Sequence, residues 1–349
     1  MPRCPNGHES ALELKCPTCG ESVLFAESLK DLAVLPPFQC TFEEIAVLSI
    51  GFPPLVFPGS HSAEIRVEKE DSLKAETLSL ATIEGATWLD YKERYLEEFQ
   101  RWLRLVSLAK SRYRVIILDA SNPLSILALT GLASYRNMIV FALTADEKSR
   151  PLEQHTSYVA LTEAFRRGIP LILATNSFME EASCFLEHEG LALGKQALSQ
   201  MLSFIFTPLG ELMDFVQRDL KLGIKAHGFS TLIAASDAVY RTVDDAFLVQ
   251  HHQTSIDLDL EEVQSAYLIA LAEKDLETPI SQGFKRYCDQ HLVNALSISQ
   301  WLNARPSRYR IYDMAIVYGL KNINIYSRLR KGYEMIANQT PDLKVERLL

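Results

Sequence analysis

Four residues near the start of the chain have the side chains and the spacing of a zinc site. Cys4 and His8 are followed by Cys16 and Cys19, which are the first and last residues of a Cys-Pro-Thr-Cys turn. Structural zinc prefers four thiolate or imidazole ligands in a tetrahedron, and short cysteine-containing turns aim their sulfur atoms at one centre. A segment this short cannot bury a core of its own, so bound metal would supply its folding free energy. The sequence therefore predicts a zinc ribbon over residues 1–28. The alternative is a cysteine-containing leader without metal.

The other cysteines and the composition limit the class of protein. Cys40, Cys184 and Cys288 are isolated in the sequence and offer no disulfide framework, which favours a reducing compartment. The chain starts with no signal-peptide pattern, and no apolar run reaches the roughly 18 residues that a bilayer span needs. We therefore expect a soluble, cytoplasmic protein without a transmembrane segment. Its 349 residues are 48% hydrophobic, which is enough for two domains behind the ribbon, and its net charge of −9 argues against nucleic acid as a partner.

Apolar strands alternate with helices in the first half of the chain. The predicted strands cover residues 45–50, 115–118, 138–143 and 171–174, and the predicted helices cover residues 88–110, 124–134 and 158–167. Strands that are apolar throughout and alternate with helices indicate a parallel sheet with helices on both faces. The sequence thus predicts a Rossmann-like α/β domain.

The second half of the chain has a different order of predicted helices and strands. Helices are expected over residues 191–206, 211–222 and 279–303, and strands over residues 230–235, 266–272, 311–318 and 326–329. This order suggests a mixed sheet with helices packed on one face. We place the boundary between the two domains near Pro208.

The order of these elements, together with three stretches of sequence, resembles the tubulin and FtsZ superfamily over roughly residues 43–335. Residues 115–125 are similar to the strand and phosphate loop of that family, residues 172–176 resemble its strand that ends in an asparagine, and residues 208–215 resemble its Pro-Gly loop with a following aspartate. The resemblance implies a Rossmann-like nucleotide domain over residues 36–207. A long central helix would join it to a smaller α/β activation-type domain over residues 208–340, and subunits would stack head to tail.

The same resemblance implies roles for individual residues. Ser121, Asn122, Ser125 and Asn176 would contact GTP or GDP, and Asp214 would act in hydrolysis at the nucleotide of the next subunit. Two of these residues have a structural alternative. Asn176 has the residue type of a helix cap at a strand end, and Asp214 has that of a solvated helix residue.

The chain departs from the family pattern where phosphate would bind. The family uses glycines because they let backbone amides approach phosphate closely, whereas this chain has no glycine between Ser121 and Ser125, and Pro123 has no N–H group. Gly51 is followed by two prolines after Phe52, and Gln217 stands where the family has a second aspartate. GTP binding and hydrolysis are therefore expected to be weakened or lost, with residual GTPase activity through Asp214 left open.

These observations favour a divergent tubulin/FtsZ-like protein that acts by self-association or by binding a protein partner through the zinc ribbon, in a cytoskeletal or scaffold role. Whether it is an enzyme stays open. The alternative is a zinc-ribbon adaptor on an unrelated Rossmann-like domain that binds a small ligand or nucleotide and does not polymerise. Binding of nucleic acid through the ribbon ranks third, because the chain is acidic.

Overall fold

The architecture is taken from a computed structural model. It describes residues 18, 45–51, 61–68, 72–73, 76–105, 111–178, 202, 205–229, 233–235, 255–256, 262–272, 276–304, 312–320 and 324–345. The described residues fall into two compact units. The first unit comprises Gln39–Asn176 and Ile323–Leu349, and the second unit comprises the described part of Ser177–Asn322.

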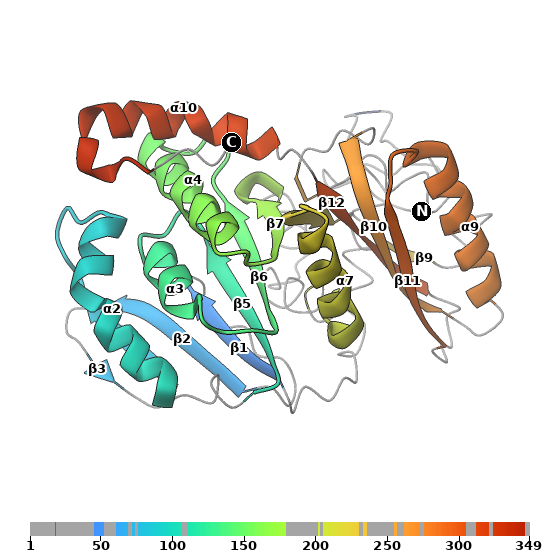
Figure 1. Cartoon of the computed structure of the whole chain (residues 1–349), viewed down its shortest axis with the longest axis horizontal. Coiled ribbons are helices and arrows are strands. Elements are labelled where there is room, and N and C mark those ends of the chain that lie inside the picture. Colours follow the sequence, from blue (N-terminus) through green and yellow to red (C-terminus); the bar gives the residue numbers. More distant parts are fainter. Residues whose placement is uncertain are drawn as a thin grey trace. The chain divides into compact units, whose positions relative to one another are not determined.

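The first unit is built on a parallel sheet (Figure 1). Its strands are β1 (Ile45–Ile50), β2 (His61–Glu68), β3 (Ser72–Leu73), β4 (Thr77–Ala81), β5 (Tyr113–Asp119), β6 (Met138–Thr144) and β7 (Leu171–Thr175). They lie in the order β7-β6-β5-β1-β2-β4-β3, and all pairs are parallel except β3 with β4. Every residue of β1 and β6 is buried, as expected of central strands in a parallel sheet. The predicted Rossmann-like arrangement is therefore confirmed in this unit.

Helices of the first unit cover one face of this sheet (Figure 1). They are α2 (Trp88–Leu105), α3 (Leu124–Leu132), α4 (Pro151–Arg166) and α10 (Asn324–Gln339), and each packs on the next in that order. The buried face of α2 follows the helical period, with Tyr91, Tyr95, Phe99 and Trp102 spaced three or four residues apart. Close packing against α3 requires Gly131, because a Cβ atom there would lie 2.6 Å from the Phe99 ring.

The second unit contains a mixed sheet. Strands β10 (Val263–Ala272) and β11 (Ser297–Ala304) are parallel, whereas β12 (Tyr312–Leu320) runs antiparallel to β10, to β8 (Ala226–Phe229) and to β9 (Ile233–Ala235). Helices α7 (Leu209–Lys221) and α9 (Glu277–His291) both pack on β10 and β11. The mixed sheet agrees with the prediction from the sequence.

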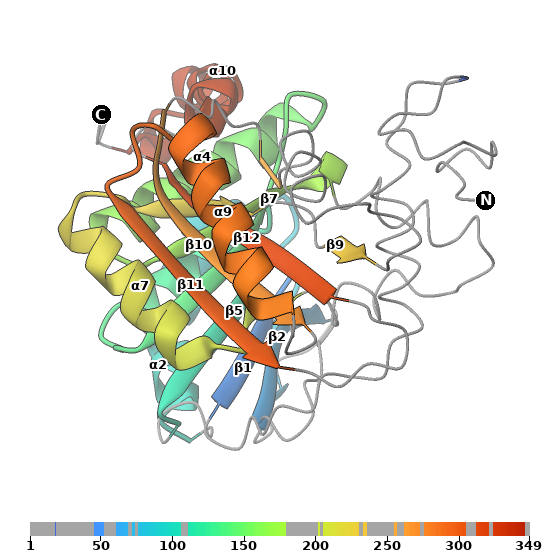
Figure 2. The ribbon, with the colours of Figure 1, turned by 90° about the vertical axis from the view of Figure 1, so that its right-hand side faces the viewer.

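Helices α7 and α9 lie on opposite faces of that sheet, so the expectation that helices pack on one face was wrong. Arg218 of α7 donates to the hydroxyls of Ser297 and Ser299, whereas Gln300 donates to Ser281 of α9. Neighbouring residues of a strand point to opposite faces, which places the two helices on either side of β11. Figure 2 shows α9 lying in front of this sheet.

Two predicted elements were wrong. The helix expected over residues 279–303 is α9 followed by strand β11, and the strand expected over residues 326–329 is part of α10. In the first case the apolar periodicity of α9 runs on past His291, and only the pairing with β10 reveals the strand. In the second case Tyr326 looks strand-like, but it packs against Tyr158 of α4 from the buried side of a helix.

The units divide the chain differently from the predicted domains. Residues 323–349 belong to the first unit because α10 packs on α4, whereas the sequence assigned residues up to 340 to a C-terminal domain. Most of the predicted central helix over residues 191–206 lies outside the described residues, as do the predicted zinc ligands Cys4, His8, Cys16 and Cys19.

Candidate functional site

The carboxyl ends of β1, β5, β6 and β7 form the polar edge of the first sheet. The strand order reverses between β1 and β5, since β1 leads to β2 on one side and β5 leads to β6 on the other. In open α/β sheets, ligands bind at the carboxyl edge beside such a reversal. Asn122 follows β5 at this point, whereas Asn176 follows β7, two strands further along the sheet.

Gly51, directly after β1, contacts Asn122 at this reversal. It has a positive φ of 70°, and a Cβ atom on it would lie 2.7 Å from Asn122 Nδ2 and 2.8 Å from Asn122 Cβ. Only glycine fits here without strain or a clash. The structure therefore brings together the two loops that the sequence compared with phosphate loops, and it fills the space between them with the side chain of Asn122.

The backbone amides after β5 bond to acceptors of the same loop. The Ser121 N–H donates to Asp119 Oδ1 at 2.9 Å, and the Asn122 N–H donates to the Asp119 carbonyl at 3.1 Å. The Leu124 N–H donates to Asn122 Oδ1, and the Ser125 N–H donates to the Asn122 carbonyl, both at 2.9 Å. Pro123 has no N–H group. Every amide from Ser121 to Ser125 that could bind phosphate therefore already has an acceptor within the loop.

The serine side chains of this loop also make hydrogen bonds within it. The Ser121 hydroxyl donates to Asp119 Oδ1 at 2.6 Å, and the buried Ser125 hydroxyl donates to the Ala120 carbonyl at 3.3 Å. Burial raises the pKa of the Asp119 carboxyl, hydrogen bonds from Ser121 oppose that shift, and the charge of Glu153 adds to it. A carboxylate in the loop would repel a phosphate group.

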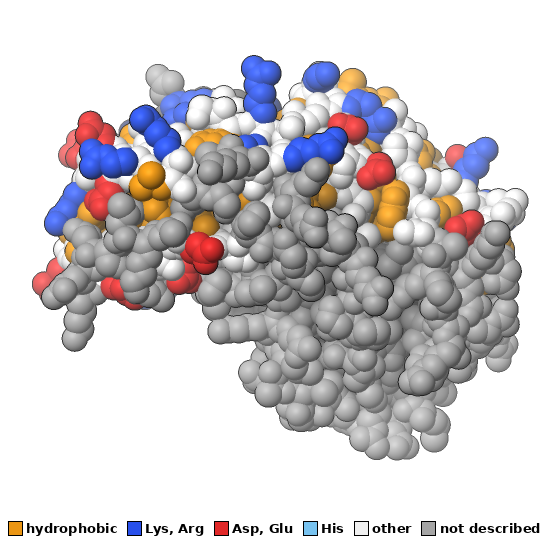
Figure 3. Space-filling view, turned by 90° about the horizontal axis from the view of Figure 1, so that it is seen from below, with side chains coloured by type: hydrophobic (Ala, Val, Ile, Leu, Met, Phe, Trp, Pro, Cys, Tyr) orange, Lys and Arg blue, Asp and Glu red, His pale blue; other side chains and the backbone are white. Residues whose placement is uncertain are grey.

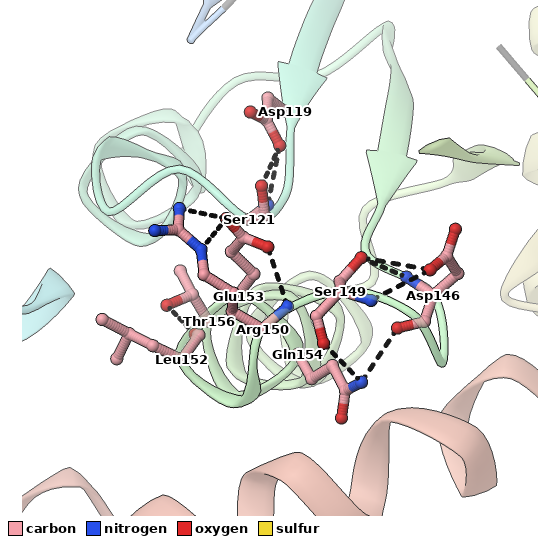
Figure 4. Close-up of polar contacts among 9 residues, drawn as sticks. All are labelled: Asp119, Ser121, Asp146, Ser149, Arg150, Leu152, Glu153, Gln154 and Thr156. Atoms are coloured by element: carbon pink, nitrogen blue, oxygen red, sulfur yellow. Dashed lines mark hydrogen bonds and ion pairs between the residues drawn. The ribbon is translucent and has the colours of Figure 1, made fainter. Parts of the chain in front are cut away.

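The loop between β6 and α4 forms a second self-bonded turn (Figure 4). Asp146 Oδ1 accepts the N–H groups of Lys148 and Ser149, at 2.9 and 3.1 Å. Gln154 Nε2 donates to the carbonyls of Asp146 and Ser149, at 2.9 and 3.0 Å. This loop was not predicted from the sequence, although the run Ser-Arg-Pro-Leu-Glu carries the signal of a helix start, with proline in the first turn and Glu153 close behind it.

Arg150 and Glu153 complete that turn. The Arg150 N–H donates to Glu153 Oε2 at 3.0 Å, and the guanidinium forms an ion pair with the same carboxylate. The hydrogen bond from the Arg150 side chain is the main cause that lowers the pKa of Glu153. The guanidinium that could meet a phosphate is therefore paired with a carboxylate of its own helix.

The candidate hydrolytic residue lies on α7 in the second unit. Asp214 is exposed on this helix, between the buried residues Met213 and Phe215. Asp219, one turn further on, is fully buried, and its Oδ2 accepts hydrogen bonds from His227 Nε2 at 2.8 Å and from Ser265 Oγ at 2.5 Å. Asp219 therefore holds α7 to the sheet and is not available as a second catalytic carboxylate.

Comparison with known proteins identifies the fold. No protein-family model and no curated protein matches the sequence. Among solved structures, CetZ from Methanosaeta thermophila aligns with a TM-score of 0.62 at 11% identity, covering 85% of this chain and 93% of CetZ. GDP-bound CetZ1 from Haloferax volcanii has a TM-score of 0.59 at 10% identity, covering 80% and 91% of the two chains. TubZ from Bacillus thuringiensis, in a GTPγS-form protofilament, has a TM-score of 0.56 at 11% identity, covering 86% and 93%.

CetZ and TubZ are members of the tubulin/FtsZ superfamily. The chain has the tubulin/FtsZ-type fold. At this low identity the likeness concerns the fold alone, and it confirms the family resemblance of the sequence at that level.

Two further findings concern metal-binding clusters and membrane-spanning helices. Within the residues that the structure describes, no group of three or more His, Cys, Asp or Glu side chains is placed to hold a metal ion. No helix in the same part of the chain is long and apolar enough to cross a bilayer.

Proposed function

We propose that this protein is a tubulin/FtsZ-type scaffold that assembles with copies of itself and in which GTP binding and hydrolysis are weakened or lost. Ser121, Asn122, Ser125 and Asn176 mark the degenerate nucleotide site, and Asp214 is the remaining candidate for hydrolysis. A zinc ribbon held by Cys4, His8, Cys16 and Cys19 would provide a separate surface for a protein partner. The protein would act in the cytoplasm.

The loop after β5 carries the nucleotide part of this proposal. A phosphate cradle depends on N–H groups that point at the ligand and have no other acceptor. Here Asp119 and Asn122 accept the amides of Ser121, Leu124 and their neighbours, so bound phosphate would have to displace hydrogen bonds that already exist. The half-buried carboxyl of Asp119 adds a negative charge, which would repel a phosphate group.

The fold supports the self-association part. A CetZ2 structure and a TubZ structure with this fold are both protofilaments. On the described surface seen in Figure 3, Lys and Arg side chains are interspersed with Asp and Glu, as on an ordinary soluble surface. That distribution supports a protein partner over nucleic acid.

Assembly and nucleotide binding should be measured together on the full chain. We expect filaments in pelleting assays and electron micrographs with or without GTP, and binding of a fluorescent GTP analogue that is too weak to saturate at micromolar concentrations. GTP turnover should be the same for the natural protein and for Asp214→Ala. Tight GTP binding together with turnover that is lost in Asp214→Ala would show an active GTPase instead. A protein that stays monomeric under all these conditions would favour the adaptor alternative.

A further inference from the structure

Strand β11 is the outer strand of the second unit's sheet. It pairs with β10 along one edge, and no strand among the described residues pairs with its other edge. Its eight residues, Ser-Ile-Ser-Gln-Trp-Leu-Asn-Ala, include no charged side chain. Soluble proteins usually protect an outer strand with charges, prolines or a bulge, because unpaired N–H and C=O groups invite pairing with another chain.

The outward-facing backbone groups can be assigned. Phe229 of β8 exchanges hydrogen bonds with Ser255, so its backbone groups face away from β12, and the alternation across β12 turns the backbone groups of Ser265 toward Gly319. The backbone groups of Ala266 therefore face β11, where the parallel register bonds them to Ser297 and Ser299. Because these directions alternate along a strand, Ile298, Gln300 and Leu302 present their N–H and C=O groups at the open edge.

Both faces of β11 are held by helices of the same unit. Arg218 of α7 donates to Ser297 and Ser299 on one face, and Gln300 donates to Ser281 of α9 on the other. The strand is therefore supported from both sides, while its edge is open. Apolar side chains are exposed where it begins, with Leu296 72% and Ile298 47% exposed. Exposed apolar residues that adjoin an open strand edge mark an interaction surface.

We propose that β11 pairs antiparallel with β11 of a second copy of this chain, about a two-fold axis at Gln300. In this register Gln300 exchanges its outward N–H and C=O groups with Gln300 of the second copy, and Ile298 exchanges its outward groups with Leu302. The register also places the exposed Ile298 opposite Leu302, which is half-buried, and it sets Gln300 opposite itself.

The self-complementary register is the reason to expect a second copy as the occupant. An apolar side chain meets an apolar one, an amide meets an amide, and no like charges face each other anywhere along the strand. The same surface patch serves both subunits, as a closed two-fold dimer requires. This contact is separate from the head-to-tail assembly proposed above and does not depend on it.

A symmetric cysteine tests the register directly. Residues at a hydrogen-bonded antiparallel position have Cα atoms about 5.5 Å apart, which lies within the range of a disulfide. Gln300→Cys should therefore give a covalent dimer of the full chain under mild oxidation. Gln282→Cys is a matched control, because Gln282 is an exposed residue of α9 outside strand β11, and the variant retains the same native cysteines. Equal cross-linking of the two variants would overturn the proposal.

Sedimentation of the full chain tests the contact without cross-linking. Ile298→Lys should weaken dimerisation by about tenfold or more, because it sets a charge against Leu302 twice in each dimer. Leu222→Lys, at a residue that is 53% exposed on the same unit, should leave the dimer unchanged. Loss of the dimer in Ile298→Lys with pelletable filaments retained would support a contact separate from filament formation. The proposal would be contradicted by a natural protein that is monomeric at all concentrations. It would also be contradicted if Ile298→Lys left the dimer dissociation constant unchanged.

Discussion

At the scale of single residues, the loop after β5 satisfies its own hydrogen-bond donors. Asp119 accepts from both the amide and the hydroxyl of Ser121, and Asn122 accepts from the amide of Leu124. These three bonds give the turn the acceptors that a phosphate would otherwise provide. The loop is thus stable without a ligand, whereas a glycine-rich cradle keeps its amides free.

Removing the charge of Asp119 should improve GTP binding. Asp119→Asn keeps an oxygen that can accept from Ser121 but removes a negative charge from the loop, so we expect the affinity for GTP to rise by about tenfold. Burial raises the pKa of Asp119, so the natural protein should approach the variant as the pH falls through that pKa and the carboxyl takes up a proton. Titration of a fluorescent GTP analogue at several pH values measures both effects.

The control for that substitution is Glu97→Gln, which removes the same charge from an exposed position on α2. It should change the affinity for GTP very little. If both variants bind GTP equally well, net charge governs binding and the loop has no special role.

Two aspartates of α7 should differ sharply in their effect on folding. Asp219→Ala would leave His227 and Ser265 buried without their acceptor, and we expect a loss of about 3–5 kcal/mol in the free energy of unfolding. Asp214→Ala removes an exposed side chain from the same helix and should leave the stability almost unchanged. Urea unfolding of the two variants measures the contrast, and similar midpoints would rule out a structural role for the buried pair.

At the scale of elements, α10 completes the first unit by packing on α4. Tyr326 and Tyr333 pack their rings on Tyr158, and Gly332 leaves room for the side chain of Gln154. Gln154 in turn holds the loop between β6 and α4 through three carbonyls. The C-terminal helix therefore supports a loop at the candidate site, even though it lies far from that loop in sequence.

Tyr333 should contribute in two separable ways. Its ring stacks on Tyr158 and His155, and its hydroxyl makes hydrogen bonds with both the N–H and the carbonyl of Val345. Tyr333→Ala should cost about 3–5 kcal/mol by leaving a cavity, and Tyr333→Phe should cost about 1 kcal/mol by removing only the hydroxyl. Chemical denaturation monitored by circular dichroism compares them. Equal losses for the two variants would show that the ring packing contributes little.

At the scale of the whole molecule, the tubulin/FtsZ-type fold persists at 10–11% identity to CetZ and TubZ. Apolar strands and helix faces tolerate extensive exchange of one hydrophobic residue for another, provided that volume and pattern are kept. A nucleotide cradle tolerates much less, because its function depends on particular backbone conformations. Retention of the fold together with a loop after β5 that lacks the family's glycines is what this difference predicts.

Metal analysis of the whole protein tests the predicted zinc ribbon. We expect about one zinc per chain, because four ligands of the types in residues 4–19 fill one tetrahedral site. A double variant, Cys16→Ser with Cys19→Ser, should lose the metal. Cys288→Ser should retain it, because Cys288 is an isolated, buried residue of α9. A native preparation free of zinc would contradict the prediction.

Many elements could be predicted from the sequence. The strands at Ile45–Ile50 and Met138–Thr144 are short, apolar and flanked by turns, and α2 carries a regular apolar stripe. Strand β11 and helix α10 could not be predicted, because the partners that decide their conformation, β10 and α4, lie far away in sequence. At the candidate site the sequence revealed the missing glycines and Pro123, but it did not reveal that Asp119 and Asn122 accept the remaining amides.

The class of fold and the absence of glycine from residues 121–125 follow from the amino-acid sequence alone, because both depend on local residue types and on periodicity along the chain. Three features become visible only in the folded chain: the strands that form the polar edge, the burial of Asp219 beside an exposed Asp214, and the return of residues 323–349 to the first unit. These features depend on contacts between segments that are distant in sequence. The free energy of such contacts comes from burial and hydrogen bonding in the folded state, which no local pattern records.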